Sequence, residues 1–187
     1  DDRIALPNVL GGKWQRVKLL GEGTFGKFWL GQHAILGMRV GIKLLRRRFT
    51  DTDTGRRLFY EEALRLGRLV HPNIVKVIDY GEEREQPYLV MEFLPGKPLD
   101  RCMAAGEVGL RDAVDVVRQV ATALVAAHGG DHTGRPLVHL DLKPEHIFVE
   151  RTDGGWHVKV IDFGIAEIVA AHDKTAAPAS TPAPRHY

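Results

Sequence analysis

Two short polar blocks at a fixed separation constrain this chain more than any other feature of its sequence. The first is HLDLKPEH at residues 139–146, and the second is the tripeptide DFG, which begins 16 residues after the first block ends. Either block by itself is compatible with an ordinary polar loop. Two further features precede them in the chain, a glycine-rich turn and a lone lysine in an apolar segment, and the ordered set of four points to a functional site.

The glycine-rich turn has the pattern Gly21-x-Gly23-x-x-Gly26. A dinucleotide-binding fold requires a helix that opens at the last glycine, whereas residues 27–30 (KFWL) continue as a strand. We therefore expect a flap between two strands, in which the glycines let backbone amides approach phosphate oxygens without a clash from Cβ atoms. A glycine-rich hairpin that binds no ligand is the alternative for this motif taken alone.

Lys43 lies in the middle of an expected strand at residues 38–46, where most neighbouring side chains are apolar. A buried ammonium group must be paired, because an unpaired one costs several kcal/mol. The following helix offers Glu61 and Glu62, and only one of them can face the sheet. The alternative is a lysine at the sheet edge whose ammonium group reaches water.

The pattern of apolar residues predicts five strands, at residues 14–21, 28–33, 38–46, 74–80 and 88–93. Helical spacing appears over residues 54–70, where Thr54 or Asp53 would cap the start, and over residues 113–128. Residues 94–98 break regular structure, and a hairpin turn is expected at residues 153–155. The expected fold class is α+β, with two lobes: a five-stranded antiparallel sheet plus one helix, then a mainly helical and incomplete lobe.

The composition argues against several classes of protein. The 187 residues carry a net charge of +2 and a single cysteine, so we expect no nucleic-acid binding and no internal disulfide. No apolar stretch approaches the ~20 residues of a membrane helix, so we expect no membrane contact in this segment. The lone thiol favours the cytoplasm, and a membrane anchor elsewhere in the full-length protein is left open. The basic run at residues 46–48 is expected to be a solvated strand end.

Taken together, the four features resemble a eukaryotic-type Ser/Thr protein kinase domain. The resemblance covers about residues 14–166, and residues 59–75 and 161–166 look most like bacterial members. It implies a flank at 1–13, a kinase N-lobe at 14–94 with a hinge at about 92–97, and a partial C-lobe at 95–187 that stops before the APE motif. The catalytic loop would be 139–146, and the activation loop would begin at 162.

The resemblance also implies roles for individual residues. Asp141 would be the catalytic base, Lys143 would steady the transferred phosphate, and Asp162 would bind Mg²⁺. Lys43 would hold the α- and β-phosphates and pair with Glu62, nine residues before His71. A protein would accept the phosphate, and ATP would bind at residues Leu20, Gly21, Glu22, Gly23, Thr24, Phe25, Gly26, Phe28, Gly41, Lys43, Glu62, Met91, Glu92, Leu94 and Phe148.

The chain departs from the family pattern at two positions of the catalytic loop. His146 stands where the family has an asparagine that binds Mg²⁺, and imidazole suits softer metals, so the second metal site is weakened or shifted toward Mn²⁺. Alternatively, His146 only makes a hydrogen bond within the loop. Leu140 replaces the arginine that pairs with a phosphorylated activation loop, so such phosphorylation should have little effect.

Two functions are therefore compared. The retained Lys43, Glu62, Asp141, Lys143 and Asp162 favour an ATP-dependent protein serine/threonine kinase, whereas His146 and Leu140 favour a pseudokinase that acts as a nucleotide-binding or scaffolding module. Because the remaining helices of the large lobe are absent from this chain, an apolar face on residues 113–128 should be exposed. We therefore expect the fragment by itself to be poorly stable or inactive.

Overall fold

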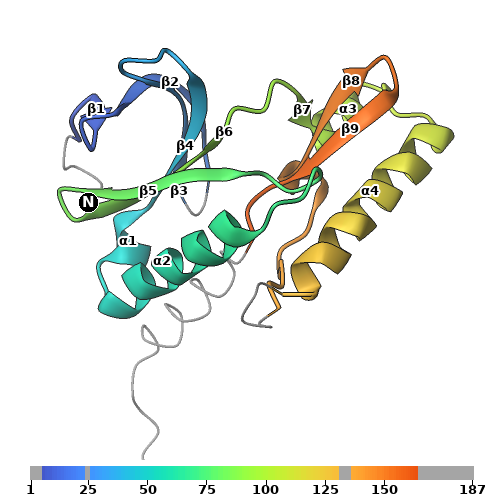
Figure 1. Ribbon diagram of the computed structural model, residues 1–187. Helices are drawn as coiled ribbons and strands as arrows, with labels where there is room; N and C mark the ends of the chain where they lie inside the picture. Colours follow the sequence, from blue (N-terminus) through green and yellow to red (C-terminus); the bar gives the residue numbers. More distant parts are fainter. Residues whose placement is uncertain (1–5, 24–25, 131–135, 164–187) are drawn as a thin grey trace, which may run out of the picture.

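The computed structural model describes residues 6–23, 26–130 and 136–163, which form two lobes (Figure 1). The chain passes from the first lobe to the second between β6 and β7. The first lobe holds an antiparallel sheet with the strand order β1-β2-β3-β4-β6-β5. Its strands are Val9–Leu10, Trp14–Glu22, Gly26–His33, Arg39–Leu45, Val77–Glu83 and Gln86–Glu92, in the order β1 to β6. All five predicted strands are present. The two-residue β1, which lies in the expected flank, was not predicted and makes the sheet six-stranded.

The middle of this sheet is apolar because β4 and β6 have neighbours on both sides. Six consecutive residues of each strand are buried, and the two strands pair in register from Val40 with Glu92 to Leu44 with Tyr88. A strand buried on both faces has a near-continuous apolar sequence rather than an alternating one. Lys43 is the charged exception within the buried part of β4, and its side chain is 9% exposed.

The helix of the first lobe, α2 (Asp53–Arg68), packs against the sheet through Phe59, Ala63 and Leu66. Its N-cap is Thr52, whose hydroxyl accepts a 3.0 Å hydrogen bond from the backbone N–H of Gly55. The cap thus precedes both predicted candidates, because the helix begins at Asp53. A single turn, α1 (Arg47–Thr50), comes before it, so the basic run begins a helix and is not a strand end.

The second lobe combines a short sheet with helices. Strands β7 (Lys97–Pro98), β8 (Ile147–Thr152) and β9 (Gly155–Val160) form a three-stranded antiparallel sheet, and the predicted hairpin turn joins the last two. Helix α3 (Leu99–Ala104) was not predicted, and α4 (Leu110–His128) begins three residues before its predicted start. The 3-10 turn η1 (Pro144–His146) precedes β8.

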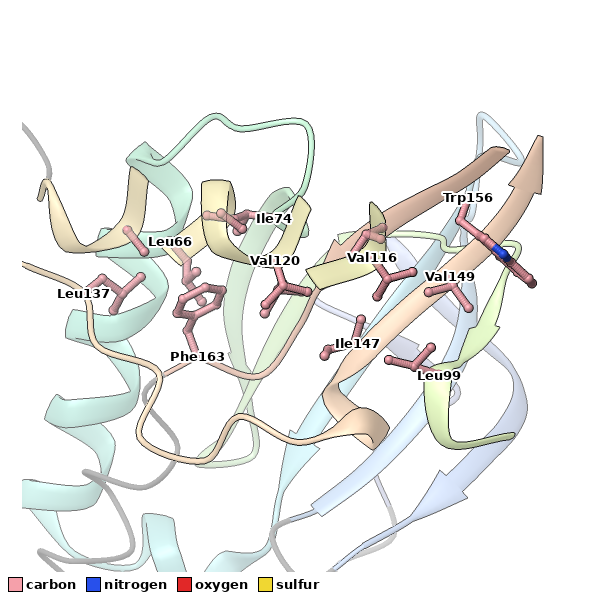
Figure 2. Packing of buried hydrophobic residues seen from close by; sticks show 14 of the residues in the cluster. Leu66, Ile74, Leu99, Val116, Val120, Leu137, Ile147, Val149, Trp156 and Phe163 are labelled. Atoms are coloured by element: carbon pink, nitrogen blue, oxygen red, sulfur yellow. The ribbon is translucent and has the colours of Figure 1, made fainter. Parts of the chain in front are cut away.

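The core of the second lobe lies between α4 and this sheet. Val116 and Val120 of α4 face Trp156 and Val149 of the two hairpin strands, and Phe163 lies at the other end of the same cluster (Figure 2). Packing one side of α4 leaves the other side uncovered: Val114, Val117 and Val125 are 64%, 66% and 73% exposed. The predicted exposed apolar face is confirmed, although the predicted single face is divided into a buried and an exposed side.

The two lobes are held together behind the hinge. The backbone N–H of Val75 donates to Val160 O at 3.0 Å, and Val160 N–H donates to Asn73 O at 2.8 Å. The Lys159 ammonium lies 2.7 Å from the carboxylate of Glu92, at the end of β6. These contacts join β9 of the second lobe to the first lobe. Within the described residues, no helix is both long and apolar enough to cross a membrane.

Candidate active site

A cavity of about 500 Å³ lies between the two lobes and brings together most of the predicted nucleotide-binding residues. Both lobes contribute to its wall: the glycine-rich turn and β4 from the first lobe, and the catalytic loop and β8 from the second. The predicted residues that line it are Leu20, Gly21, Glu22, Gly23, Gly26, Phe28, Gly41, Lys43, Leu94, Lys143, His146, Phe148 and Asp162. Three lining residues were not predicted: Lys27, Glu145 and Ile161. A further lining residue, Phe93, belongs to the hinge predicted at about 92–97. The predicted Thr24 and Phe25 lie outside the described residues.

The glycine-rich turn forms a flap that packs tightly against β4 at Gly26 and has free space beside Gly21 and Gly23. A Cβ atom on Gly26 would lie 2.1 Å from Leu44 O, whereas nothing lies within 4 Å of the corresponding positions at Gly21 and Gly23. The flap is held from below by Arg46, which donates to Gly23 O at 3.2 Å and lies 3.0 Å from the Glu22 carboxylate. Sequence reasoning missed this role of Arg46, because it assigned the basic run to solvent.

The charged centre of the cavity is the pair Lys43 and Asp162, whose Nζ and Oδ1 atoms are 2.6 Å apart. Burial alone would raise the pKa of Asp162, but the adjacent ammonium group outweighs burial and holds the pKa below its ordinary value. Asp162 is therefore an ionised carboxylate that faces the cavity. A carboxylate is the oxygen donor that Mg²⁺ and Mn²⁺ both accept, so this residue fits the divalent metal that the fold implies.

Behind this pair lies a second cavity of about 10 Å³, lined by Lys43, Glu62, Met91 and Phe163 among others. Glu62 is 5% exposed on the inner side of α2, whereas the side chain of Glu61 is 48% exposed and lies 4.0 Å from Arg57. Glu62, rather than Glu61, therefore shares the rear cavity with Lys43, in agreement with the choice that the resemblance implied. Met91 is 3% exposed and closes the rear of the nucleotide cavity rather than lining it.

The hinge lies at the outer edge of the cavity. Phe93 and Leu94 line the cavity itself, and they also line a shallow crevice on its far side together with Glu92. The backbone N–H of Glu92 donates to Lys76 O at 2.9 Å, so it is not free to bind an adenine. The predicted contact of Glu92 with the nucleotide would therefore have to use its carbonyl oxygen, while Phe93 and Leu94 lie on the cavity wall.

The catalytic loop brings its charged residues next to this cavity. Lys143 Nζ lies 2.9 Å from Asp141 Oδ2, and about a third of the Asp141 side chain is exposed to solvent. The backbone adopts the left-handed conformation at Leu140 and at Asp162, each with φ of 62°. Non-glycine residues rarely adopt this conformation, and such residues cluster at functional sites. Leu140 itself is 58% exposed.

His139 supports the loop from inside the protein. Its Nε2 lies 2.8 Å from Ile161 O, and its ring packs 4.7 Å from that of Phe163. A carbonyl oxygen only accepts, so Nε2 carries the proton, and Nδ1 is left as the acceptor for the Asp141 N–H at 3.4 Å. Burial lowers the pKa of His139, which keeps the ring neutral in this arrangement.

His146 bridges the two acidic residues of the site. Its Nδ1 lies 2.8 Å from Asp141 O, and its Nε2 lies 3.8 Å from Asp162 Oδ2. Because the carbonyl oxygen requires a donor, Nδ1 carries a proton, and Nε2 is the ring nitrogen that faces the Asp162 carboxylate. The hydrogen bond within the loop, one of the two alternatives expected for His146, is therefore present, and the other ring nitrogen faces the carboxylate that would hold the metal.

Comparison with known proteins agrees with this geometry. Residues 14–184 match the family model described as the protein kinase domain. The chain is 40% identical over 172 residues to serine/threonine-protein kinase Pkn1 of Myxococcus xanthus, covering 89% of this chain and 23% of that protein. It is 36% identical over 169 residues to serine/threonine-protein kinase PknA of Mycobacterium tuberculosis, covering 87% of this chain and 37% of that protein.

Among solved structures, the PknI kinase domain of Mycobacterium tuberculosis superposes with a TM-score of 0.71 and 28% sequence identity. The match covers 88% of this chain and 68% of that kinase domain. The chain spans well under half of the curated relatives named above. The family model, however, covers nearly the whole of this chain. The chain therefore belongs to the protein kinase domain family.

Proposed function

We infer that this chain is the nucleotide-binding part of an ATP-dependent protein serine/threonine kinase. The observation that carries this inference is the geometry across the cavity: Lys43 Nζ lies 2.6 Å from Asp162 Oδ1, while Asp141 and Lys143 pair at 2.9 Å on the adjoining loop. Phosphoryl transfer needs little covalent work from the protein, so catalysis depends on positioning and on neutralising charge. These four residues are placed to do both.

Each residue then has a physical task. Lys43 and the backbone amides of the flap bind phosphate oxygens of the nucleotide, and Asp162 holds the divalent metal, which supplies charge neutralisation at the phosphates when bound. Asp141 accepts the proton of the substrate hydroxyl, for which its partly exposed carboxylate is accessible. Lys143 keeps that carboxylate oriented and offers a positive charge to the transferred group.

Phosphate transfer from labelled ATP tests the proposal, using the domain extended to its natural end and Asp141→Asn as the control. Transfer that disappears in the variant supports the kinase. The absence of transfer with either Mg²⁺ or Mn²⁺, despite thermal stabilisation by nucleotide, would instead support the pseudokinase. For this segment we propose a cytoplasmic location, because its composition carries no feature of a secreted or membrane-spanning protein.

We propose that the enzyme prefers Mn²⁺ to Mg²⁺, because the imidazole Nε2 of His146 faces Asp162 where an oxygen ligand would suit Mg²⁺. Replacing His146 with asparagine, whose amide oxygen is a harder donor, should raise activity with Mg²⁺ and narrow the difference between the metals. The measurement is the initial rate against concentration of each metal. Equal rates with both metals in the unmodified enzyme would contradict this preference.

We further propose that phosphorylation of the activation loop has little effect on the rate. Leu140 is exposed at the position where the family places an arginine, and a leucine side chain cannot bind a phosphate group. Rates of the phosphorylated and the phosphatase-treated protein should agree within about twofold. A large increase on phosphorylation would show that another cation takes the place of that arginine.

A further inference from the structure

A buried pair of side-chain amides joins the two lobes outside the nucleotide cavity. Asn73 lies in the loop between α2 and β5, Gln119 lies on α4, and each is 8% exposed. Their neighbours along the chain, Ile74 and Val120, belong to the buried apolar cluster of the second lobe (Figure 2). A buried amide that lacks hydrogen-bond partners destabilises the folded protein, so each polar atom of this pair should be bonded.

Every polar atom of the Gln119 side chain has its full set of partners. Its Oε1 accepts from Asn73 Nδ2 at 2.9 Å and from the backbone N–H of Val158 at 3.1 Å. Its Nε2 donates to Trp156 O at 2.7 Å and to Asp115 Oδ2 at 2.8 Å. A side-chain amide offers two donor hydrogens and an oxygen with two lone pairs, so these bonds use its whole capacity. The orientation is fixed as well, because a reversed amide would set its nitrogen against two donors.

These bonds close the open edge of β9. The sheet order β7-β8-β9 leaves the outer side of β9 without a partner strand. Gln119 bonds the first two backbone groups on that side, and Asn73 Nδ2 donates to the next, Val158 O, at 2.9 Å. Val160 then exchanges two backbone hydrogen bonds with the loop, through Asn73 O and Val75 N–H. The two amides and the loop backbone therefore take the place of a further strand.

The segments that meet here lead directly to charged residues of the site. Asp162 follows Val160 by two residues on the strand that the loop holds. On the other side, Leu66 lies one helical turn after Glu62 and packs into the same buried cluster as Val160. The 2.6 Å contact between Lys43 and Asp162 spans the two lobes. A shift of the loop relative to β9 would therefore change the geometry of this contact.

We propose that Gln119 and Asn73 are positioning residues for phosphoryl transfer. Their amides fix the loop after α2 to β9, and this connection sets the distance between Lys43 and Asp162 across the cavity. The proposal rests on the kinase activity proposed above and adds two residues that are not among those lining the cavity in the described part of the chain. The flap, β4 and the hinge bind the nucleotide mainly through the first lobe. Transfer also requires the acidic residues of the second lobe in place, so a loosened connection should lower kcat more than it weakens ATP binding.

The test compares Gln119→Met with Gln86→Met in the full-length protein. Methionine keeps the length of the side chain and removes its hydrogen bonds. Gln86 is also a buried amide, 7% exposed, but its 2.7 Å bond to Leu45 O stays within the first lobe. Both changes should lower the midpoint of thermal unfolding. Only Gln119→Met should also lower kcat, roughly tenfold to a hundredfold, with the KM for ATP changed by less than about threefold.

Gln119→Glu adds a readout that a loss of stability alone would not move. The charged group in contact with position 119 is Asp115 of α4, itself paired with Arg118, while the loop and β9 contribute an amide and backbone groups. Burial and the Asp115 carboxylate should both raise the pKa of a glutamic acid there. Its protonated form accepts and donates much as glutamine does. The ratio of its kcat to that of the unmodified enzyme should therefore rise as pH falls from about 8 to about 6, whereas the ratio for Gln119→Met should stay constant.

Each outcome bears on the proposal in a defined way. An unchanged kcat in folded Gln119→Met protein would overturn it, as would an equal loss of kcat in Gln86→Met. If Gln119→Met does not fold, the pH profile of Gln119→Glu decides, because a flat or falling ratio overturns the proposal. In these cases the unmodified protein still transfers phosphate and remains a kinase. A full-length protein that transfers no phosphate in any form overturns both proposals, since no reaction then remains for Gln119 to position.

Discussion

The two ends of the nucleotide cavity are built on different physical principles. At the phosphate end, Lys43 and Asp162 form a partly buried ion pair whose geometry the reaction itself dictates. At the base end, Phe28 and Gly41 satisfy a volume constraint that other pairs of residues meet equally well. The phosphate end keeps the family's Lys43 and Asp162, although His146 nearby departs from the pattern. At the base end, Phe28 and Gly41 stand where the family signatures have a valine and an alanine, so a larger residue is offset by a smaller one.

The two ends of the cavity should tolerate different kinds of substitution. Removing one charge from the phosphate end leaves its partner as an unpaired buried charge. A change in the size of a neighbouring side chain cannot restore the lost charge. A change at the base end alters packing, which a second change of opposite volume corrects. Stability distinguishes the two ends, because the free energy of unfolding responds both to an unpaired buried charge and to a backbone clash.

The largest effect is expected for Lys43→Met, which removes the cation while keeping a side chain of similar length. Asp162 is then a poorly solvated carboxylate without its 2.6 Å partner, so its pKa rises and the free energy of unfolding falls by about 3–5 kcal/mol. Urea denaturation followed by circular dichroism measures this. Below the pKa that the carboxylate has in the unfolded chain, about 3.9, the variant and the unmodified protein should differ less.

Lys97→Met is the matched control for that variant. Lys97 also pairs with a carboxylate, that of Glu107 at 2.9 Å, but the two side chains are 60% and 38% exposed. An exposed pair contributes at most about 1 kcal/mol. Equal losses of stability in the two lysine variants would show that burial does not distinguish the phosphate end from an ordinary surface pair.

An intermediate effect is expected for Gly26→Ala at the base of the flap. The new Cβ atom would meet Leu44 O at 2.1 Å and the backbone of Leu45 at 3.0 Å, and backbone atoms in a paired strand cannot move aside. We expect a loss of about 1–3 kcal/mol in the free energy of unfolding. Gly23→Ala, where nothing lies within 4 Å, is the control and should change stability far less.

This variant also sharpens the contrast with Gly41, since both glycines leave no room for a Cβ atom but for different reasons. The obstacle at Gly26 is backbone, so no change of side chain should rescue Gly26→Ala. The obstacle at Gly41 is the ring of Phe28, so Phe28→Val should rescue Gly41→Ala. Rescue of Gly26→Ala by a smaller neighbouring side chain would remove the distinction between a backbone constraint and a side-chain constraint.

Much of this site was predictable because its signals are local in the sequence. The five longer strands followed from the apolar period, and most of the cavity lining followed from the family resemblance that the motifs carry. The ion pair between Lys43 and Asp162 joins residues 119 positions apart, so only the fold could show it. The resemblance instead supplied Glu62 as the partner, and the structure places that residue beside Lys43 in the rear cavity.

The features that sequence reasoning missed depend on tertiary contacts. The two-residue β1 has no period of its own and exists through its pairing with β2. Arg46 belongs to a basic run that suggests solvent exposure, yet its guanidinium reaches the flap 23 residues earlier in the chain. Helix α4 is apolar on two sides, and its sequence does not indicate which side packs against β9.

The smallest effect concerns pH and the histidine beneath the phosphate end. Burial lowers the pKa of His139 relative to the unfolded chain, where it is about 6.5, so the unfolded state binds a proton first as pH falls. The stability that neutral His139 contributes is therefore complete above pH 6.5 and is lost as pH falls toward its pKa in the folded state. The slope is at most about 1.4 kcal/mol per pH unit for one proton.

Urea denaturation between pH 7.5 and 5 measures this slope, with His139→Gln and His128→Gln compared against the unmodified protein. His139→Gln should flatten the profile, because glutamine keeps a donor for Ile161 O but does not titrate in this range. His128, exposed at the end of α4, should leave the profile unchanged when replaced. An unchanged slope in His139→Gln would show that another group titrates in this range. His139 would then stabilise the loop through its packing against Phe163 rather than through its neutral charge state.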